Sequence, residues 1–182
     1  GSFQRAVRAP NIVELFLPSF FGLWGGQDPC TVTTPTSSAP PPSFTQAQCE
    51  RTGLTPAQYA ITSSTYGFAC PSAQCAANFT GNTALKPESS DTKSFGFVFT
   101  PTFLKGFNAQ VDYYDIFVDQ IIGVIPQATV ITGCANSVVG SPEDLFFCPR
   151  IHRAAGTGVL SGAGFIDSPI ENLGYVQTTG VD

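Results

Sequence analysis

The chain has 182 residues, of which only 12% are charged, and it contains 16 phenylalanines, 18 glycines and 15 prolines. This length is enough for one domain with its own core, and the composition is typical of a protein rich in strands and loops. The formal net charge is -5 and no run of Lys or Arg is present, which argues against nucleic acid as a partner. The longest apolar run, IIGVI, is much shorter than the roughly 18 residues of a membrane helix, so any contact with a bilayer would be made by strands.

The first expected element is the end of a short alternating strand in residues 1–10. It stops at Pro10, which has a fixed φ and no N–H to donate to a neighbouring strand. Residues 11–80 show little periodicity, and only SFTQAQCERTGL and TPAQYAIT are predicted to be helical. In the second of these, Thr55 is the expected N-cap and Pro56 lies in the first turn. A connection of this length is expected to be functional or disordered.

A hairpin of two alternating strands is predicted between residues 81 and 125, with a short turn at 101–106. After Tyr113 the alternation changes phase, which predicts a bulge or the end of an embedded segment. The alternation fits a strand between a protein core and water, and it fits equally well a strand between lipid and a wet lumen. One face is predicted to be apolar, with Phe95, Phe97, Phe99, Phe107, Ala109, Val111 and Tyr113.

A second irregular stretch covers residues 126–169, and a further alternating strand begins at about residue 170. This last strand is still alternating at Asp182. We therefore expect the chain to be a piece of something longer.

The six cysteines lie in irregular segments rich in Pro, Ser and Gly, which favours disulfides in an oxidising compartment. Local pairing is the simplest hypothesis, with pairs Cys30–Cys49, Cys70–Cys75 and Cys134–Cys148. Closing the first and third loops would stabilise the fold by about 3 kcal/mol each. Metal binding is the less favoured alternative, because the cysteine spacing does not match a zinc site and the single histidine, His152, is distant in sequence.

Few residues suggest a binding or catalytic role. Phe20, Phe21 and Trp24 would suit stacking on an organic ligand, although a loop that packs on its own aromatic side chains is the favoured reading. Asp112, Asp115 and Asp119 would suit a cation, although solvation on a wet barrel wall is favoured. No motif of a nucleophile with its base is present, so neither enzymatic activity nor a cofactor is expected.

Four segments resemble the TonB-dependent outer-membrane receptors, and they occur in that family's order: AVRAPNIVELF at 6–16, GNTALKPESSDTKSFGFVFTP at 81–101, VDYYDIFVDQI at 111–121 and ENLGYVQTTGVD at 171–182. The resemblance implies an all-β fold in which antiparallel strands belong to a transmembrane barrel of about 22 strands with long, disulfide-braced extracellular loops. About four strands from the carboxy-terminal half of that barrel would be present.

On this mapping, residues 11–80 and 126–169 are extracellular loop regions and 101–106 is a periplasmic turn. The outer membrane of a Gram-negative bacterium is the implied location, with lipid around the apolar face of the hairpin. The plug domain and the segment that contacts TonB are not recognised, so import would require the remainder of the receptor. The implied ligand is a scarce nutrient: a siderophore, a vitamin or an oligosaccharide.

Two functions remain open at this point. The first is a segment of an outer-membrane transporter, with the Phe95, Phe97 and Phe99 face on lipid. The second is a secreted or cell-surface binding module, disulfide-stabilised and rich in strands, with that face packed in a sandwich core. The first is favoured because the chain has too few further strands for an opposing sheet.

Overall fold

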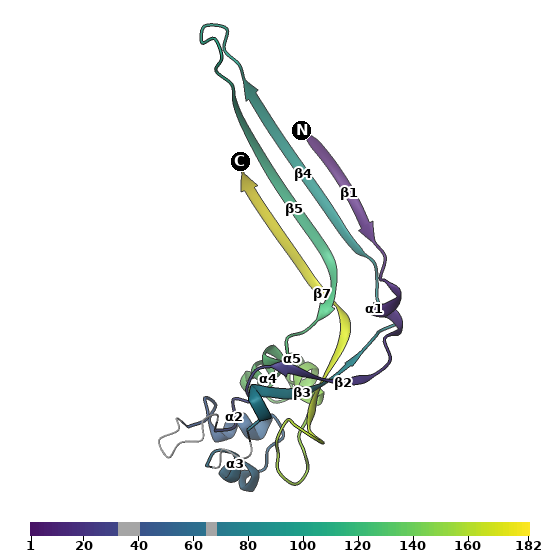
Figure 1. Ribbon diagram of the computed structural model, residues 1–182, viewed down its shortest axis with the longest axis vertical. Coiled ribbons are helices and arrows are strands. Elements are labelled where there is room, and N and C mark those ends of the chain that lie inside the picture. Colours follow the sequence, from purple (N-terminus) through teal and green to yellow (C-terminus); the bar gives the residue numbers. More distant parts are fainter. Residues whose placement is uncertain (33–40, 65–68) are drawn as a thin grey trace. The chain divides into compact units, whose positions relative to one another are not determined.

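A computed structural model describes residues 1–32, 41–64 and 69–182. The chain divides into two compact units (Figure 1). The strand unit comprises Gly1–Phe16, Asn82–Gly123 and Ile170–Asp182, and the disulfide unit comprises Leu17–Gly81 and Val124–Pro169.

The strand unit is a sheet of long neighbouring strands in the order β1-β4-β5-β7 (Figure 1). A short helix, α1 (Ile12–Phe16), follows β1. Both β1 and β5 pair with β4 in antiparallel fashion. Asp112 and Asp182 exchange two backbone hydrogen bonds of 2.9 Å, the pattern of an antiparallel pair, and so join β5 to β7. The strands are β1 (Ser2–Arg8), β4 (Glu88–Phe99), β5 (Ala109–Val124) and β7 (Phe165–Val181), and the residues of β7 before Ile170 belong to the disulfide unit.

The pairing of β4 with β5 runs without interruption from Phe99↔Ala109 to Ser89↔Asp119. The bulge predicted after Tyr113 is therefore not formed, and the other interpretation, that an embedded segment ends there, stays a prediction. The backbone irregularity comes later, at Gln120, whose φ is 58°. The connection between the strands covers 100–108, so Phe107 lies in the turn and not on the strand face where the sequence had placed it.

The disulfide unit contains short strands and short helices. In it β2 (Phe20–Gly25) pairs antiparallel with β3 (Gln74–Thr80), β3 pairs parallel with the first residues of β7, and β6 (Ile151–His152) pairs antiparallel with β7. The helices are α2 (Gln46–Arg51), α3 (Pro56–Thr62), α4 (Gln127–Asn136) and α5 (Pro142–Phe147), with 3-10 turns η2 (Pro71–Ala73) and η3 (Cys148–Arg150).

Capping residues allowed α3 to be predicted from the sequence, whereas α4 has no such signal. Thr55 caps α3, accepts a hydrogen bond from the Gln58 backbone N–H, and is followed by Pro56 in the first turn, as predicted. In contrast, α4 follows Pro126 and has no side-chain cap. It is held instead by the burial of one face, formed by Val130, Ile131, Cys134 and Ala135.

The hydrophobic core lies in the disulfide unit. Its main cluster includes Trp24, Val130, Ile131, Leu160 and Ile166, together with three of the cysteines. Within the residues that the structure describes, no side chain of the strand unit is buried, on either face of the sheet. A globular sheet protein would cover at least one face with a second layer. The sheet therefore stands without a core of its own.

Candidate functional site

The two faces of the β4–β5 hairpin differ in character near its turn. Paired residues of an antiparallel sheet point to the same side, so Phe95, Phe97 and Phe99 share a face with Tyr113, Val111 and Ala109, their respective partners. The three phenylalanines are 66%, 58% and 45% exposed. On the opposite face Gly96 is paired with Asp112, and Ser94 with Tyr114. One face is thus apolar, with side chains that are about half exposed, and the other is mostly polar.

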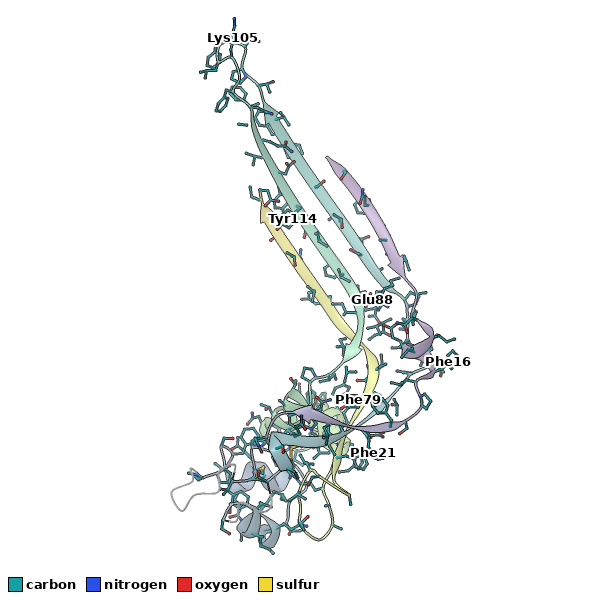
Figure 2. All side chains as sticks on the ribbon, viewed as in Figure 1. Phe16, Phe21, Phe79, Glu88, Lys105 and Tyr114 are labelled. Atoms are coloured by element: carbon teal, nitrogen blue, oxygen red, sulfur yellow. A yellow bond between two sulfur atoms is a disulfide. The ribbon has the colours of Figure 1, made fainter. Side chains whose placement is uncertain are left out.

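The three phenylalanines of β4 on the first face lie in the half of the hairpin near the turn. Figure 2 shows Lys105 in this turn and Glu88 at the opposite end of β4. Beyond Phe95 the same face carries Lys93, then Asp91, whose carboxylate lies 3.5 Å from Arg5 of β1. Charged side chains therefore join this face beyond Phe95, although Phe117, the partner of Asp91 on β5, lies on the same face.

At the end of the strands away from the turn, a hydrogen-bonded network joins the strand ends. Arg8 of β1 donates to Glu88 of β4 at 2.6 Å and to Glu14 of α1 at 3.1 Å. The second carboxylate oxygen of Glu88 accepts the backbone N–H of Ile122 in β5 at 2.6 Å. Asn172 of β7 donates to the backbone carbonyls of Lys86 and Gln120. These residues form the rim network, and four successive strands are tied together by it.

The residues of the rim network lie within or beside segments on which the receptor resemblance rests. The family model described as TonB dependent receptor-like, beta-barrel matches residues 1–182, the whole chain. The chain belongs to this family. Comparison with curated proteins and comparison with solved structures find no match. The TonB-dependent receptors are transporters whose barrels lie in the outer membrane of Gram-negative bacteria, and their plug domain contacts TonB.

The open sheet of the strand unit agrees with this assignment as part of a receptor barrel. A sheet in lipid must hydrogen-bond all of its backbone groups laterally, so its strands have to belong to a closed barrel. The smallest such barrels have about eight strands. The strands described for this unit are therefore one sector of a receptor barrel wall.

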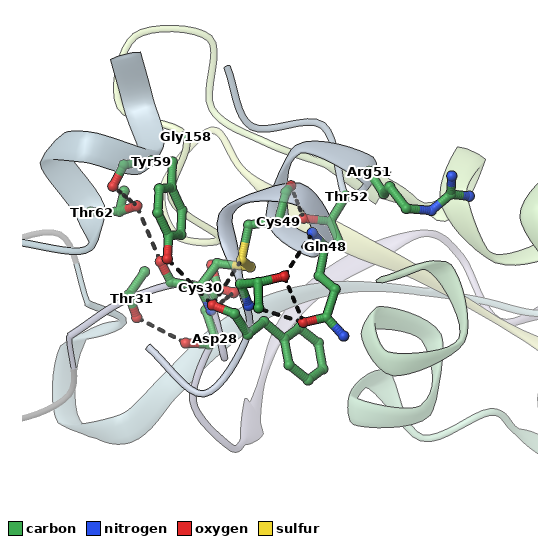
Figure 3. The surroundings of a disulfide bond; sticks show 12 residues. Asp28, Cys30, Thr31, Gln48, Cys49, Arg51, Thr52, Tyr59, Thr62 and Gly158 are labelled. Carbon is green, nitrogen blue, oxygen red and sulfur yellow. Dashed lines mark hydrogen bonds between the residues drawn. A yellow bond between two sulfur atoms is a disulfide. The ribbon is translucent and has the colours of Figure 1, made fainter. Parts of the chain in front are cut away.

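The disulfide unit is braced by three bridges, and they join the pairs that the sequence favoured: Cys30–Cys49, Cys70–Cys75 and Cys134–Cys148. Beside the first bridge lies a buried ion pair that the sequence did not predict. Arg153 donates to Asp28 at 2.7 Å and to the Thr52 hydroxyl at 2.7 Å. Asp28 also accepts the backbone N–H of Cys30 at 3.0 Å. Figure 3 shows Asp28 and Thr52 around the Cys30–Cys49 bridge.

The aromatic residues considered for ligand contact have different environments. Trp24 is only 7% exposed and belongs to the core, so the structure removes it from the candidate surface. Phe20 stacks on Phe79, with a centroid distance of 5.4 Å, and Phe21 packs edge-on against Phe165 at 5.0 Å. All three pack on the protein's own side chains, while Phe20 and Phe21 also keep exposed surface.

A second cluster that sequence reasoning missed surrounds Asp167 of β7. Its carboxylate accepts from the Asn78 side chain at 3.1 Å and lies 2.6 Å from Nε2 of His152. The hydroxyl of Ser19 donates to Asn78 at 2.7 Å. The His152 ring stacks on Phe165 with centroids 4.6 Å apart. His152, whose role the sequence left open, is thus a partner of Asp167.

The structure offers no cation site at the three aspartates singled out from the sequence. Asp112 and Asp115 bond to glutamine side chains on the sheet, namely Gln110 and Gln177. In the described ranges, no group of three or more His, Cys, Asp and Glu side chains could hold a metal ion. Nor does any described helix have the length and apolar character needed to cross a membrane.

Proposed function

We propose that this chain forms part of the wall and the outer loops of a TonB-dependent transporter that captures and imports a scarce nutrient. In this role the face with Phe95, Phe97, Phe99, Val111 and Tyr113 lies on lipid, and the face with Asp112 and Ser94 lines the wet interior. The observation that carries the proposal is an apolar face that is in register across two strands and exposed. Side chains of this kind are stable in contact with lipid and costly in water.

Chain connectivity supports an extracellular position for the disulfide unit. Its two segments, 17–81 and 124–169, are both inserted at the strand ends away from the turn at 100–108. Barrels of this class have short turns on the periplasmic side and long loops outside. Three disulfides are also suited to an oxidising compartment. Ligand capture by this unit would be followed by import through the complete receptor, powered through TonB.

The alternative is a secreted or cell-surface binding module whose sheet is covered by a second layer. The described strand unit has no buried side chain on either face, which speaks against it, because a sandwich requires side chains of two sheets to interdigitate. The sheet itself does not indicate whether the transporter carries a siderophore, a vitamin or an oligosaccharide.

Neighbouring positions on β4 provide a direct test of the lipid-facing side. Phe97 and Val98 are both more than half exposed but point to opposite faces. We would place a tryptophan at each position in turn, in the complete receptor reconstituted with brominated lipids, which quench indole fluorescence on contact. Relative to the unsubstituted receptor, whose own tryptophans include the buried Trp24, Phe97→Trp is expected to add strongly quenched fluorescence and Val98→Trp weakly quenched fluorescence. Equal quenching at the two positions would refute the assignment of faces.

A further inference from the structure

A cavity in the disulfide unit, of about 500 Å³, has a volume within the range of small-molecule sites. Its floor is made by two parallel strands. Asn78 of β3 is paired with Asp167 of β7, and Thr80 with Pro169. Alternate residues of a strand point to the same side, so these four side chains line one surface of the cavity. A carboxylate, an amide and a hydroxyl are thereby brought together.

The opposite wall of the cavity comes from α5 and η3. It presents Phe146, Pro149 and Arg150, together with Leu145. The guanidinium of Arg150 lies 4.2 Å from the centroid of the Phe146 ring, and its Nε donates to the Phe146 carbonyl at 3.1 Å. The Cys134–Cys148 disulfide links α4 to the first residue of η3. The wall is therefore held in place before any ligand arrives, which lowers the entropy cost of binding.

Asp167 is the strongest hydrogen-bond acceptor of the cavity floor. Its two oxygens are held by Asn78 and His152, so its orientation is determined by hydrogen bonds. The side chain nevertheless remains 37% exposed. Each carboxylate oxygen has two lone pairs, so both can accept a further hydrogen bond from a ligand. Two adjacent hydroxyl groups match such a pair of acceptors.

The charge of the lining selects between ligand classes. One cation, Arg150, and one anion, Asp167, line the cavity, so it has no net charge to attract a strongly ionic ligand. Phe146, Pro149 and Pro169 present apolar surface, which suits the C–H groups of a saturated ring. We propose that this cavity binds an uncharged sugar unit of a glycan, with Asp167 accepting from its hydroxyl groups. The inference rests on the proposed function, because it names the ligand class that the outer loops capture.

The test uses the complete receptor in detergent and an array of neutral and acidic oligosaccharides, followed by calorimetry with the neutral oligosaccharide that gives the strongest signal. Asp167→Asn keeps the shape of the side chain but removes the charged acceptor, and should weaken binding by about tenfold or more. Glu143→Gln is the matched control, because Glu143 is an exposed carboxylate on α5 that does not line this cavity. Its affinity should equal that of the wild type.

Thr80→Val serves as a second variant in case Asp167→Asn disturbs folding, which hydrogen exchange of the disulfide unit would report. It should weaken binding by a few fold. Failure of the wild-type receptor to bind any neutral oligosaccharide, or unchanged affinity in the correctly folded cavity variants, overturns the inference. If either of these results is obtained while Phe97→Trp is still quenched by brominated lipid, the sugar site is refuted but the transporter proposal remains in place. Equal quenching at Phe97 and Val98 would instead refute the lipid-facing sheet.

Discussion

Replacing Arg153 with methionine tests how far the buried ion pair stabilises the disulfide unit. The side chains of Arg153 and Asp28 are 3% and 0% exposed, and the guanidinium also donates to the carbonyl of Gly158 at 2.9 Å. Methionine fills similar space but leaves the Asp28 carboxylate buried with only the backbone N–H of Cys30 among these contacts. Removing one partner of a buried ion pair costs about 3–5 kcal/mol.

The loss of stability should be confined to the disulfide unit, so hydrogen exchange, which reports on each segment separately, is the suitable assay for the complete receptor. A change of about 3–5 kcal/mol in the free energy of opening corresponds to exchange that is faster by a hundredfold to several thousandfold in the disulfide unit. Peptides from β4 and β5 should exchange as in the wild type. Arg51→Met is the control, because the Arg51–Asp144 pair is 20% exposed on both sides and should contribute less. Equal effects of the two substitutions would refute the argument from burial.

Two further perturbations address the same unit. Replacing Cys30 and Cys49 together with serine should destabilise the loop that this disulfide closes by about 3 kcal/mol and should weaken ligand binding. Heat-modifiable migration of the variant on gels should still show an intact barrel. Unchanged ligand affinity would show that the bridge has no role in capture. Gly164→Ala should lower the thermal unfolding temperature, because its Cβ would overlap the carbonyl oxygen of Val159 and lie 2.8 Å from the Ala154 nitrogen, at a cost of about 1–3 kcal/mol. Gly156→Ala, with no atom near its Cβ, should leave that temperature unchanged.

Features that depend on near neighbours in the chain could be predicted from the sequence. The alternation of Phe95, Phe97 and Phe99 identified one face of the hairpin because strand periodicity is a local property. The α3 cap at Thr55 was foreseen for the same reason. The disulfides joined cysteines that are close in sequence, with separations of 5 to 19 residues. The bounds of the turn were less well predicted, and Phe107 was wrongly placed on the strand face.

The short strands β2 and β3 could not be read from the sequence. Phe20–Gly25 contains two glycines, and Gln74–Thr80 has no clear alternation. These strands exist because each finds a partner: β2 pairs with β3, and β3 pairs with β7 across a long sequence separation. Likewise, the sequence offered Trp24 as a ligand contact, whereas in the structure it is buried in one cluster with Ile131 and Leu160.

By itself, the sequence determined the family, through the order of its motifs along the chain. It also predicted the apolar face of the hairpin and favoured the local disulfide pairs, because strand periodicity and short cysteine spacings are properties of residues close in sequence. Only the tertiary structure decided that Asp28 meets Arg153, and that Asp167 meets Asn78 and His152 beside a cavity. The residues Asp28 and Arg153 are 125 positions apart, and Asn78 and Asp167 are 89 apart. Such contacts arise from the pairing of distant strands and the burial of a shared core, and no local pattern records them.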